Sequence, residues 1–290
     1  MKRKVVAILI VVLIILFAFC LRQCCFKSAE ESGETDNGNS KQIKVHFIDV
    51  GQGDSCFIEL PNGKVMLIDS GDSKHAETVT NYIASLGYNT IDFVVATHAD
   101  ADHIGAMADV FEDFEIKNCY TSSVKSNTRT YKNFVKAVND EGIKLKYPHS
   151  NDYIVNEKNL DVEVMGPLAN KTYSNTNDSS VVLQVSYYKT DYLFTGDSEY
   201  NTLLEYNLEP IEVLKVSHHG SKTGTNKKLL NILMPKYAII SAAQRNRYNH
   251  PHIQVMNLLE NAGVKIYKTS ESGTITALSD ATHLEFVTEK

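Results

Sequence analysis

The 290 residues of this chain are 43% hydrophobic and 22% charged, an ordinary globular composition that excludes a low-complexity or collagen-like protein. Its length accommodates one large α/β domain or two small ones. The formal net charge is −6, but five of the 29 Lys and Arg residues and none of the 35 acidic residues lie in 1–27, so the remainder has a balance of −11. A domain this acidic has little non-specific attraction for a polyanion, which argues against avid DNA binding.

The N-terminus has the pattern of a membrane anchor. Residues 5–21 form an uninterrupted apolar run, and about 17 residues is near the lower limit for a helix that spans a bilayer. No small-x-small cleavage site follows the run, which favours an uncleaved anchor over the alternative, a cleaved signal peptide. Basic residues are denser before the run than after it. We therefore predict a single-pass protein of the cell membrane with an extracytoplasmic domain, or a secreted protein if the segment is cleaved.

The cysteines and the next segment complete the domain organisation. Cys20, Cys24 and Cys25 lie near the outer end of the apolar run, but no small residue precedes them as a lipoprotein signal requires, so lipidation is not favoured. Cys56 and Cys119 are interpreted as buried small hydrophobic residues rather than a disulfide pair. Residues 28–41 lack hydrophobic periodicity and predict a disordered acidic linker. The predicted parts are an anchor or signal at 1–27, a linker at 28–41 and a folded domain at 42–290.

Strands are predicted from short apolar runs and helices from apolar residues spaced three and four apart. The elements are, in chain order, strands at 44–49, 56–60 and 65–69, a helix at 76–86, a strand at 93–96, a helix at 106–113, a strand at 118–120, a helix at 131–138, a strand at 162–165, a hairpin at 181–188 and 192–195, a helix at 200–208, a strand at 213–217, a helix at 227–233, a strand at 237–241, a helix at 254–262, a strand at 265–267, and a closing pair at 274–278 and 284–288. Strands first cluster and then alternate with helices. Two sheets packed face to face with helices outside satisfy both halves, so the predicted fold class is α/β, an αββα sandwich preceded by one membrane-spanning helix.

Four polar loops follow apolar strands of this pattern, and a packed sheet delivers such loops to one edge. They are residues 51–54, 98–103, 196–197 and 218–222. The second loop holds two His and two Asp residues on one turn between a strand and a helix, and these ligand types suit zinc, manganese or iron. A solvated acidic loop is the alternative, but it explains neither the interleaved small residues nor the preceding strand. Asp197, directly after an apolar run, is costly as a lone carboxylate unless a cation is present, although an ordinary turn aspartate is the alternative.

These motifs resemble the metallo-β-lactamase-fold hydrolases, and within them the soluble C-terminal domain of ComEC-type competence proteins. The general pattern His-x-His-x-Asp-His reads here His98-x-Asp100-x-Asp102-His103, and Asp in place of the second His is similar to the ComEC type. Four further motifs carry the resemblance, at residues 49–54, 195–197, 216–222 and 246–252. The similarity covers about residues 44–278. It implies the four-layer αββα sandwich of the metallo-β-lactamase type.

The resemblance also implies a site with two divalent metal ions, zinc or manganese. His98 and Asp100 would hold one ion, Asp102 and His103 the second, and Asp197 would bridge them. Two such ions lower the pKa of a bridging water, so that hydroxide exists at neutral pH, and they clamp the attacked group. Asp102 is assigned the orientation of that hydroxide. Hydrogen bonds to the ligand imidazoles are expected from Asp49 or Asp69.

Two histidine ligands of the family have no counterpart, one in the loop before residue 181 and one after the strand that ends at Ser241. Asn177 or Asp178 either replaces the first or only shapes the loop. The second is expected from the remaining histidines, with Asp54 as a further candidate ligand. Those histidines are His218, His219, His250 and His252.

Adjacent side chains in an extended stretch point in opposite directions, so only one of His218 and His219 is expected to contact a metal. His218 is assigned to the metal, and His219 to proton donation to the leaving group or to substrate contact. Lys222 is suited to neutralising a phosphoryl oxygen in the transition state, with a solvated surface lysine as the alternative. His250 and His252 either begin the last helix or belong to the site.

The favoured function is metal-dependent hydrolysis of phosphodiester bonds, with DNA as the substrate implied by the resemblance. A local cationic rim supports an anionic substrate despite the acidic whole, and it consists of Lys222, Lys227, Lys228, Arg245 and Arg247. The alternatives are a metallo-hydrolase of another ester, a lactam or a phosphorylated envelope polymer, and a non-catalytic binding module with a degenerate metal site. The membrane is a partner through the anchor, and no protein partner is predicted.

Overall fold

The first sheet begins with an antiparallel meander of β1 (Ile43–Phe47), β2 (Cys56–Glu59) and β3 (Val65–Ile68) in the computed structural model, which describes residues 41–290. β3 then pairs in parallel with β5 (Phe93–Ala96), which continues to β7 (Cys119–Thr121) and β8 (Leu145–Lys146). The C-terminal hairpin of β16 (Ile275–Ser279) and β17 (Leu284–Thr288) joins the other side of β1. The order across the sheet is β17-β16-β1-β2-β3-β5-β7-β8.

The second sheet has seven strands. Those from the earlier part of the chain pair antiparallel, and those from the later part pair in parallel. In order across the sheet these are β15 (Lys265–Lys268), β14 (Tyr237–Ile240), β13 (Val213–Lys215), β12 (Thr190–Phe194), β11 (Val182–Tyr187), β10 (Leu160–Gly166) and β9 (Tyr153–Glu157). A separate short ladder pairs β4 (Thr90–Ile91) with β6 (Glu115–Ile116). The change to parallel pairing follows from the helical crossovers predicted for the last third of the chain.

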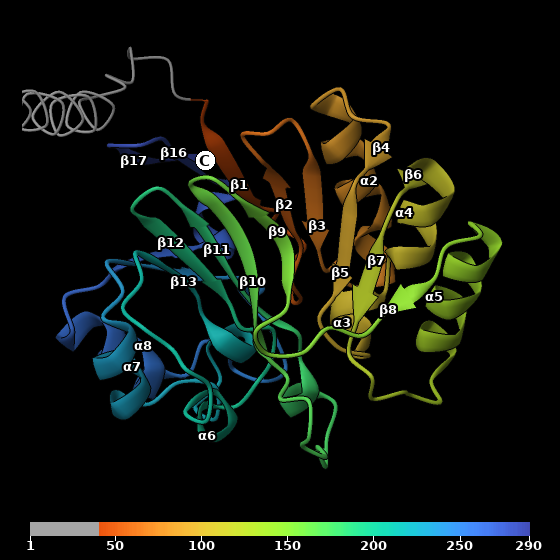
Figure 1. Ribbon diagram of the computed structural model, residues 1–290. Helices are drawn as coiled ribbons and strands as arrows, with labels where there is room; N and C mark the ends of the chain where they lie inside the picture. The colour runs from red at the N-terminus through yellow and green to blue at the C-terminus, as the bar shows by residue number, and fades with distance from the viewer. Residues whose placement is uncertain (1–40) are drawn as a thin grey trace, which may run out of the picture. The chain divides into compact units, whose positions relative to one another are not determined.

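The longer helices lie on the outer faces of the two sheets (Figure 1), and short helices and turns lie between strands in the chain. They are α2 (Ala76–Ser85), α3 (Ala101–Ile104), α4 (Met107–Asp113), α5 (Arg129–Asp140), α6 (Tyr200–Leu203), α7 (Lys227–Leu233), α8 (Ile253–Asn261) and α9 (Thr269–Ser272), with 3₁₀ turns η1 (Ser73–His75), η2 (Asn177–Ser179) and η3 (Ser217–Gly220). Side-chain caps fix the starts of α5 and α7: Thr128 accepts a hydrogen bond from the Tyr131 N–H, and Asn226 accepts one from the Leu229 N–H.

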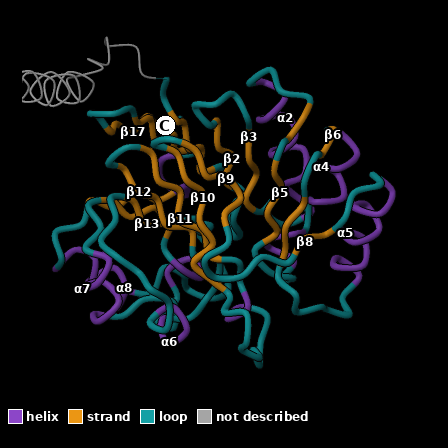
Figure 2. Tube along the Cα trace, in the orientation of Figure 1, coloured by secondary structure: helices purple, strands orange, loops and turns teal. Residues whose placement is uncertain are grey.

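Three apolar clusters separate the layers. The central cluster lies between the sheets and joins residues such as Phe47 and Val95 to Val164 and Phe194. A second packs the other face of the first sheet against α2, α4 and α5, and a third packs the second sheet against α7 and α8. The predicted αββα sandwich is confirmed, and Figure 2 shows the two strand layers with helices on either side. Cys56 and Cys119 are buried and unpaired, as predicted.

The predicted membrane anchor and most of the linker lie outside the described residues. Within residues 41–290, none of the helices combines the length and apolarity that a bilayer crossing requires.

The main errors of the sequence prediction lie at element ends. The predicted helix at 106–113 is α4, but a short helix, α3, already begins at Ala101 and so contains Asp102 and His103. The predicted helix at 200–208 ends at Leu203, and the strand predicted at 213–217 ends at Lys215, where η3 begins. β9 was not predicted, because an edge strand with one exposed face has a weak apolar pattern.

Candidate metal centre

Both sheets deliver polar side chains to one edge of the sandwich. From the first sheet, Asp69 follows β3, His98 follows β5 and His103 lies on α3. From the second sheet, Asp197 follows β12, and His219 lies on η3 after β13. All five residues are buried, so their polar atoms must find partners inside the protein or in a bound ion.

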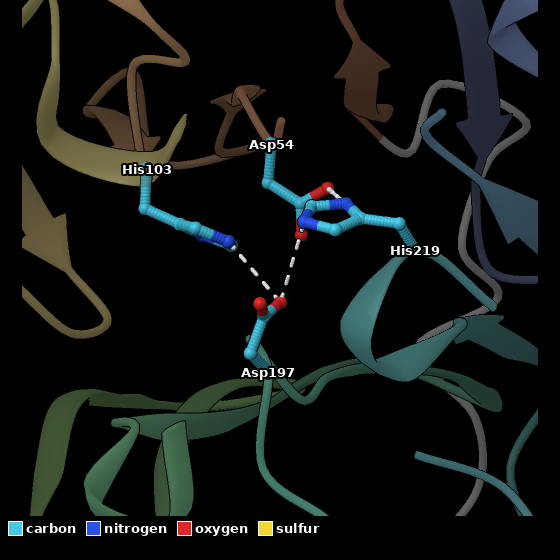
Figure 3. A group of neighbouring side chains, drawn as sticks. All are labelled: Asp54, His103, Asp197 and His219. Carbon is cyan, nitrogen blue, oxygen red and sulfur yellow. Dashed lines mark ion pairs between the residues drawn. The ribbon is translucent and has the colours of Figure 1, made fainter. Parts of the chain in front are cut away.

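The Asp197 carboxylate lies at the centre of this group. Its Oδ1 atom is 3.1 Å from His103 Nε2 and 3.6 Å from His219 Nε2. Its Oδ2 atom is 3.6 Å from His218 Nε2 and 3.9 Å from His98 Nε2. Each oxygen therefore faces a different pair of imidazoles, and Figure 3 shows the rings of His103 and His219 directed toward the carboxylate. This division is the arrangement that a carboxylate shared by two cations requires.

Two further carboxylates extend the two halves of the centre. Asp100 Oδ2 lies 3.9 Å from His98 Nε2, on the side of Asp197 Oδ2. Asp102 Oδ2 lies 3.5 Å from His219 Nε2, on the side of Asp197 Oδ1. The side chain of Asp100 is 43% exposed and that of Asp102 28%, so both lie on the open side of the centre.

Hydrogen bonds on the far side of three rings leave their Nε2 atoms free. The His103 Nδ1–H donates to Asp69 Oδ2 at 2.7 Å, and the His219 Nδ1–H donates to the Ser241 carbonyl at 3.0 Å. The Thr97 hydroxyl donates to Asp69 and therefore accepts from His98 Nδ1, 3.0 Å away. In neutral rings with Nδ1 protonated, Nε2 carries a lone pair.

These free atoms fit a metal. The Nε2 atoms of His98, His103 and His219 and the Oδ1 atom of Asp197 are buried and have no aligned hydrogen-bond partner within residues 41–290. Ligand atoms of Asp54, His103, Asp197 and His219 lie within 4.8 Å of one another. Buried imidazole nitrogens and carboxylate oxygens without partners are costly in a metal-free protein, and they are the donors that zinc and manganese take.

The two predicted supporting aspartates have different surroundings. Asp69 accepts hydrogen bonds from the Thr97 N–H, the Thr97 hydroxyl and the His103 ring, each at 2.7 Å. It therefore orients ligands on two successive loops. Asp49 instead accepts from the Gly51 N–H and lies 3.8 Å from Lys290 Nζ, without a hydrogen bond to an imidazole.

Lys215 is a buried residue of the centre that the sequence analysis missed. Its Nζ lies 2.7 Å from Asp54 Oδ2, and Asp54 Oδ1 lies 3.3 Å from His219 Nδ1. The pair is buried, and the Lys215 ammonium and the His219 ring hold the pKa of Asp54 well below its usual range despite the opposing effect of burial. A lysine inside the apolar strand at 213–217 was the available signal.

The carboxylates bind positive charge strongly. Although burial lowers it, the pKa of His219 is raised to about 10 by Asp197 and Asp54, and the pKa of His103 is raised well above its usual value by Asp197 and Asp69. Burial opposes ionisation of Asp197, but the neighbouring histidines hold its pKa well below the usual range. Protons and metal ions therefore compete for the same nitrogen atoms.

The expectation that His218 and His219 point in opposite directions was wrong. The segment is not extended but a 3₁₀ turn, in which His218 has φ of 50° and His219 has φ of 54°. Both left-handed residues direct Nε2 toward Asp197, each at 3.6 Å. His219 lies in the buried group, whereas the His218 side chain is 25% exposed at its margin.

The other candidate residues lie around the centre. The Asp178 carboxylate accepts hydrogen bonds from the Glu199 N–H and from the Asn175 side-chain amide, and it therefore shapes the loop. Asn177 begins η2, and its carbonyl accepts from the hydroxyl of Ser180. Neither residue belongs to the four-residue cluster.

The remaining histidines lie beyond His218 and His219. The His250 ring packs 5.5 Å from the His218 ring and 6.3 Å from that of His219. Burial and these neighbouring histidines lower the pKa of His250 to about 4. His252 is the N-cap of α8 without a side-chain cap bond, and its Nδ1 instead accepts from the N–H of Lys222, whose side chain is exposed.

The fold and the site define a class of protein. Residues 48–244 match the metallo-beta-lactamase superfamily model, and the chain belongs to that superfamily. Solved structures agree at the level of the fold. The chain is similar to the metallo-beta-lactamase fold protein YhfI from Bacillus subtilis, with a TM-score of 0.52 and 10% identity over 85% of this chain and 100% of that one. It is also similar to CmlA, a diiron beta-hydroxylase from Streptomyces venezuelae, with a TM-score of 0.55 and 12% identity over 83% of this chain and 55% of that one.

The sequence relatives are competence and recombination proteins. The chain is 32% identical to ComE operon protein 3 of Bacillus subtilis over 258 residues, which is 81% of this chain and 33% of the relative. It is 29% identical to Recombination protein 2 of Haemophilus influenzae over 80% of this chain and 28% of the relative. The chain thus corresponds to about a third of the length of these relatives, and its resemblance to ComEC-type proteins is confirmed at the level of homology.

Proposed function

We propose that this chain is a membrane-anchored hydrolase that uses two divalent metal ions to cleave phosphodiester bonds, with DNA as its substrate. The observation that carries the proposal is the Asp197 carboxylate, whose two oxygens each face a separate pair of imidazoles. Similarity to proteins named for competence and recombination supports a nucleic acid as the substrate. The apolar run at 5–21 supports the anchor, with the folded domain outside the cytoplasm.

The residues of the centre divide into two groups of candidate ligands that share Asp197. One group consists of His98, Asp100 and His218, and the other of Asp102, His103 and His219, with Asp54 beside it. When bound, such ions supply hydroxide at neutral pH and positive charge for the attacked phosphoryl group.

The protein's own contribution is orientation and charge. Asp69 fixes the His103 ring, and Lys215 holds Asp54 ionised beside His219. Asp102, on the open side of the centre, is placed to accept a hydrogen bond from an attacking water and to orient it. The exposed ammonium of Lys222 is suited to a non-bridging phosphoryl oxygen.

The test is an activity panel with the full-length chain. Manganese or zinc is added with single-stranded DNA, duplex DNA, RNA or bis(p-nitrophenyl) phosphate. Nucleic-acid products are separated by electrophoresis, and release of p-nitrophenol is followed by absorbance. We expect DNA degradation that Asp102→Ala abolishes and that Asp109→Ala, a matched change at an exposed position of α4, leaves intact. Cleavage of small esters alone rejects DNA as the substrate, and metal binding without any hydrolysis supports a binding module instead.

A further inference from the structure

A groove beside the candidate metal centre carries unpaired positive charge. Its volume is about 440 Å³, and its lining includes Asp102 together with Lys74, Arg245 and Arg247. Only three arginines occur in residues 41–290, and two of them line this groove. None of the three cations forms an ion pair with a carboxylate of the described part of the chain, which is otherwise rich in acidic residues.

The loop that carries the two arginines is held by Asn246. The side-chain amide of Asn246 donates to the carbonyls of Ala243 and His250, at 2.9 and 2.6 Å, and accepts from the N–H groups of Tyr248 and His250, at 3.1 and 2.9 Å. Four bonds from one side chain fix the backbone on both sides of Arg247. The arginines are therefore presented by an ordered loop, which reduces the entropy lost when a ligand binds.

The guanidinium of Arg247 is itself positioned. It lies 4.8 Å from the centre of the Tyr248 ring and donates a hydrogen bond to the Tyr248 hydroxyl. The Tyr248 ring stacks on His250 at 5.5 Å, and His250 packs against His218. Continuous ring contacts thus connect the groove to the metal centre and fix the arginine relative to it.

Gln52 is a neutral residue of the groove lining. Its side-chain Nε2 and Oε1 atoms are buried and have no hydrogen-bond partner within residues 41–290. Asp72, the other carboxylate of the lining, already accepts a hydrogen bond from the Lys74 N–H. Three free cations and an unused amide donor next to a hydrolytic centre are suited to phosphate oxygens.

We propose that Lys74, Arg245 and Arg247 form a subsite for the phosphates that flank the scissile bond of a single-stranded nucleic acid. This inference rests on the proposed function for the position of the cleaved bond. The groove volume is in the lower part of the range for small-ligand sites, about 300–1,000 Å³, which suits one or two nucleotides of a single strand rather than a duplex. A small phosphoester has no flanking phosphate and does not use the subsite.

Binding is measured first. A chelator is present, so the oligonucleotide is not cleaved and the measurement does not depend on activity. Fluorescence anisotropy of a fluorescein-labelled oligothymidylate is followed across a salt series with the full-length chain and with Arg245→Gln/Arg247→Gln. The slope of log K against log salt is negative, and each lost phosphate contact reduces its magnitude by roughly 0.7 for single strands, so we expect the magnitude to fall by about 1.4. Lys132→Ala/Lys144→Ala, two exposed lysines elsewhere, keeps the slope.

Hydrolysis of bis(p-nitrophenyl) phosphate by the metal-loaded chain is the second measurement, and we expect the arginine variant to retain it. An unchanged salt slope overturns the subsite, and so does an equal loss of oligonucleotide binding and ester hydrolysis, because the arginines would then act on the centre itself. Duplex DNA that binds as tightly as the single strand, and depends equally on the arginines, overturns the single-strand assignment. If the wild type hydrolyses nothing but the variant still loses binding, the proposed function fails, and the subsite stands only as a phosphate-binding site for a single strand, without a neighbouring cleaved bond.

Discussion

Replacement of Asp197 by asparagine is the sharpest test of the metal centre. The side chain keeps its size, but the four imidazoles whose Nε2 atoms lie 3.1 to 3.9 Å from the carboxylate lose their shared negative charge. Loss of a residue that only supports a ligand typically costs about 10–100-fold in metal affinity. A carboxylate that itself contacts both ions contributes more, so we expect Asp197→Asn to lower the affinity by at least about 100-fold, or roughly 2.8 kcal/mol.

The assay is equilibrium dialysis against zinc or manganese, followed by elemental analysis of the full-length chain. We expect two ions per wild-type chain and fewer than one per Asp197→Asn chain at the same free metal concentration. Asp191→Asn is the matched control, because Asp191 lies on β12, the strand that precedes Asp197, but is half-buried and hydrogen-bonded to Gln184 away from the centre. If Asp197→Asn retains two ions at unchanged affinity, the shared-carboxylate reasoning is refuted.

Three further substitutions test the supporting structure. Lys215→Met leaves the buried Asp54 carboxylate without its partner and should lower the free energy of unfolding by about 3–5 kcal/mol in a denaturant titration, with partial recovery in Lys215→Met/Asp54→Asn. Asp69→Asn should weaken metal affinity by about 10–100-fold in the same dialysis, because the His103 ring loses its charged acceptor, whereas unchanged affinity would exclude that role. Gly53 has φ of 140°, and an added Cβ would lie 2.4 Å from a backbone oxygen of α3. Gly53→Ala should therefore cost at least about 1–3 kcal/mol of stability, and a melting temperature equal to that of the wild type would contradict this.

The fold was predictable because its strands are continuous apolar runs bounded by polar loops. The segment at 93–96 is an example, since all four residues are buried and the strand occupies the predicted range. The loops that follow such strands meet at one edge, so the order of the motifs sufficed to bring His98, His103 and Asp197 together. The pattern of apolar residues predicts which face of each strand or helix is buried, and the buried faces determine how the layers of the sandwich pack.

Features that depend on local backbone conformation were not predictable. His218 and His219 are bulky residues in a left-handed backbone conformation, and no sequence pattern predicts that conformation for two successive histidines. Their strain is consistent with a functional turn, because it directs both rings to one carboxylate. The Lys215 partnership with Asp54 joins residues 161 positions apart, and only the packing of the two sheets reveals it.

The charge of the centre explains why the groove matters. Five carboxylates and one lysine lie in or beside the centre, a formal balance of −4 that two divalent ions cancel; the residues are Asp54, Asp69, Asp100, Asp102, Asp197 and Lys215. A loaded centre is thus nearly neutral with uncharged imidazoles. It offers little long-range attraction for a polyanion, and the acidic remainder of the domain offers none. If the substrate is a phosphodiester chain, as we propose, the unpaired cations of the groove are a local source of affinity for it.

The competition between protons and metal predicts opposite pH dependences for the two forms of the protein. His219 has a pKa raised from 6.5 to about 10 in the metal-free fold, so the native state holds a proton that the unfolded state releases. Stability from this group is fully present below pH 6.5 and is lost as the pH rises toward 10. Metal binding requires that same nitrogen without its proton, so metal affinity should rise over the same interval. Thermal melts between pH 6 and 9, with chelator or with saturating zinc, should therefore show falling stability without metal and an increasing stabilisation by metal. Parallel curves would show that the ion does not bind at the His219 ring.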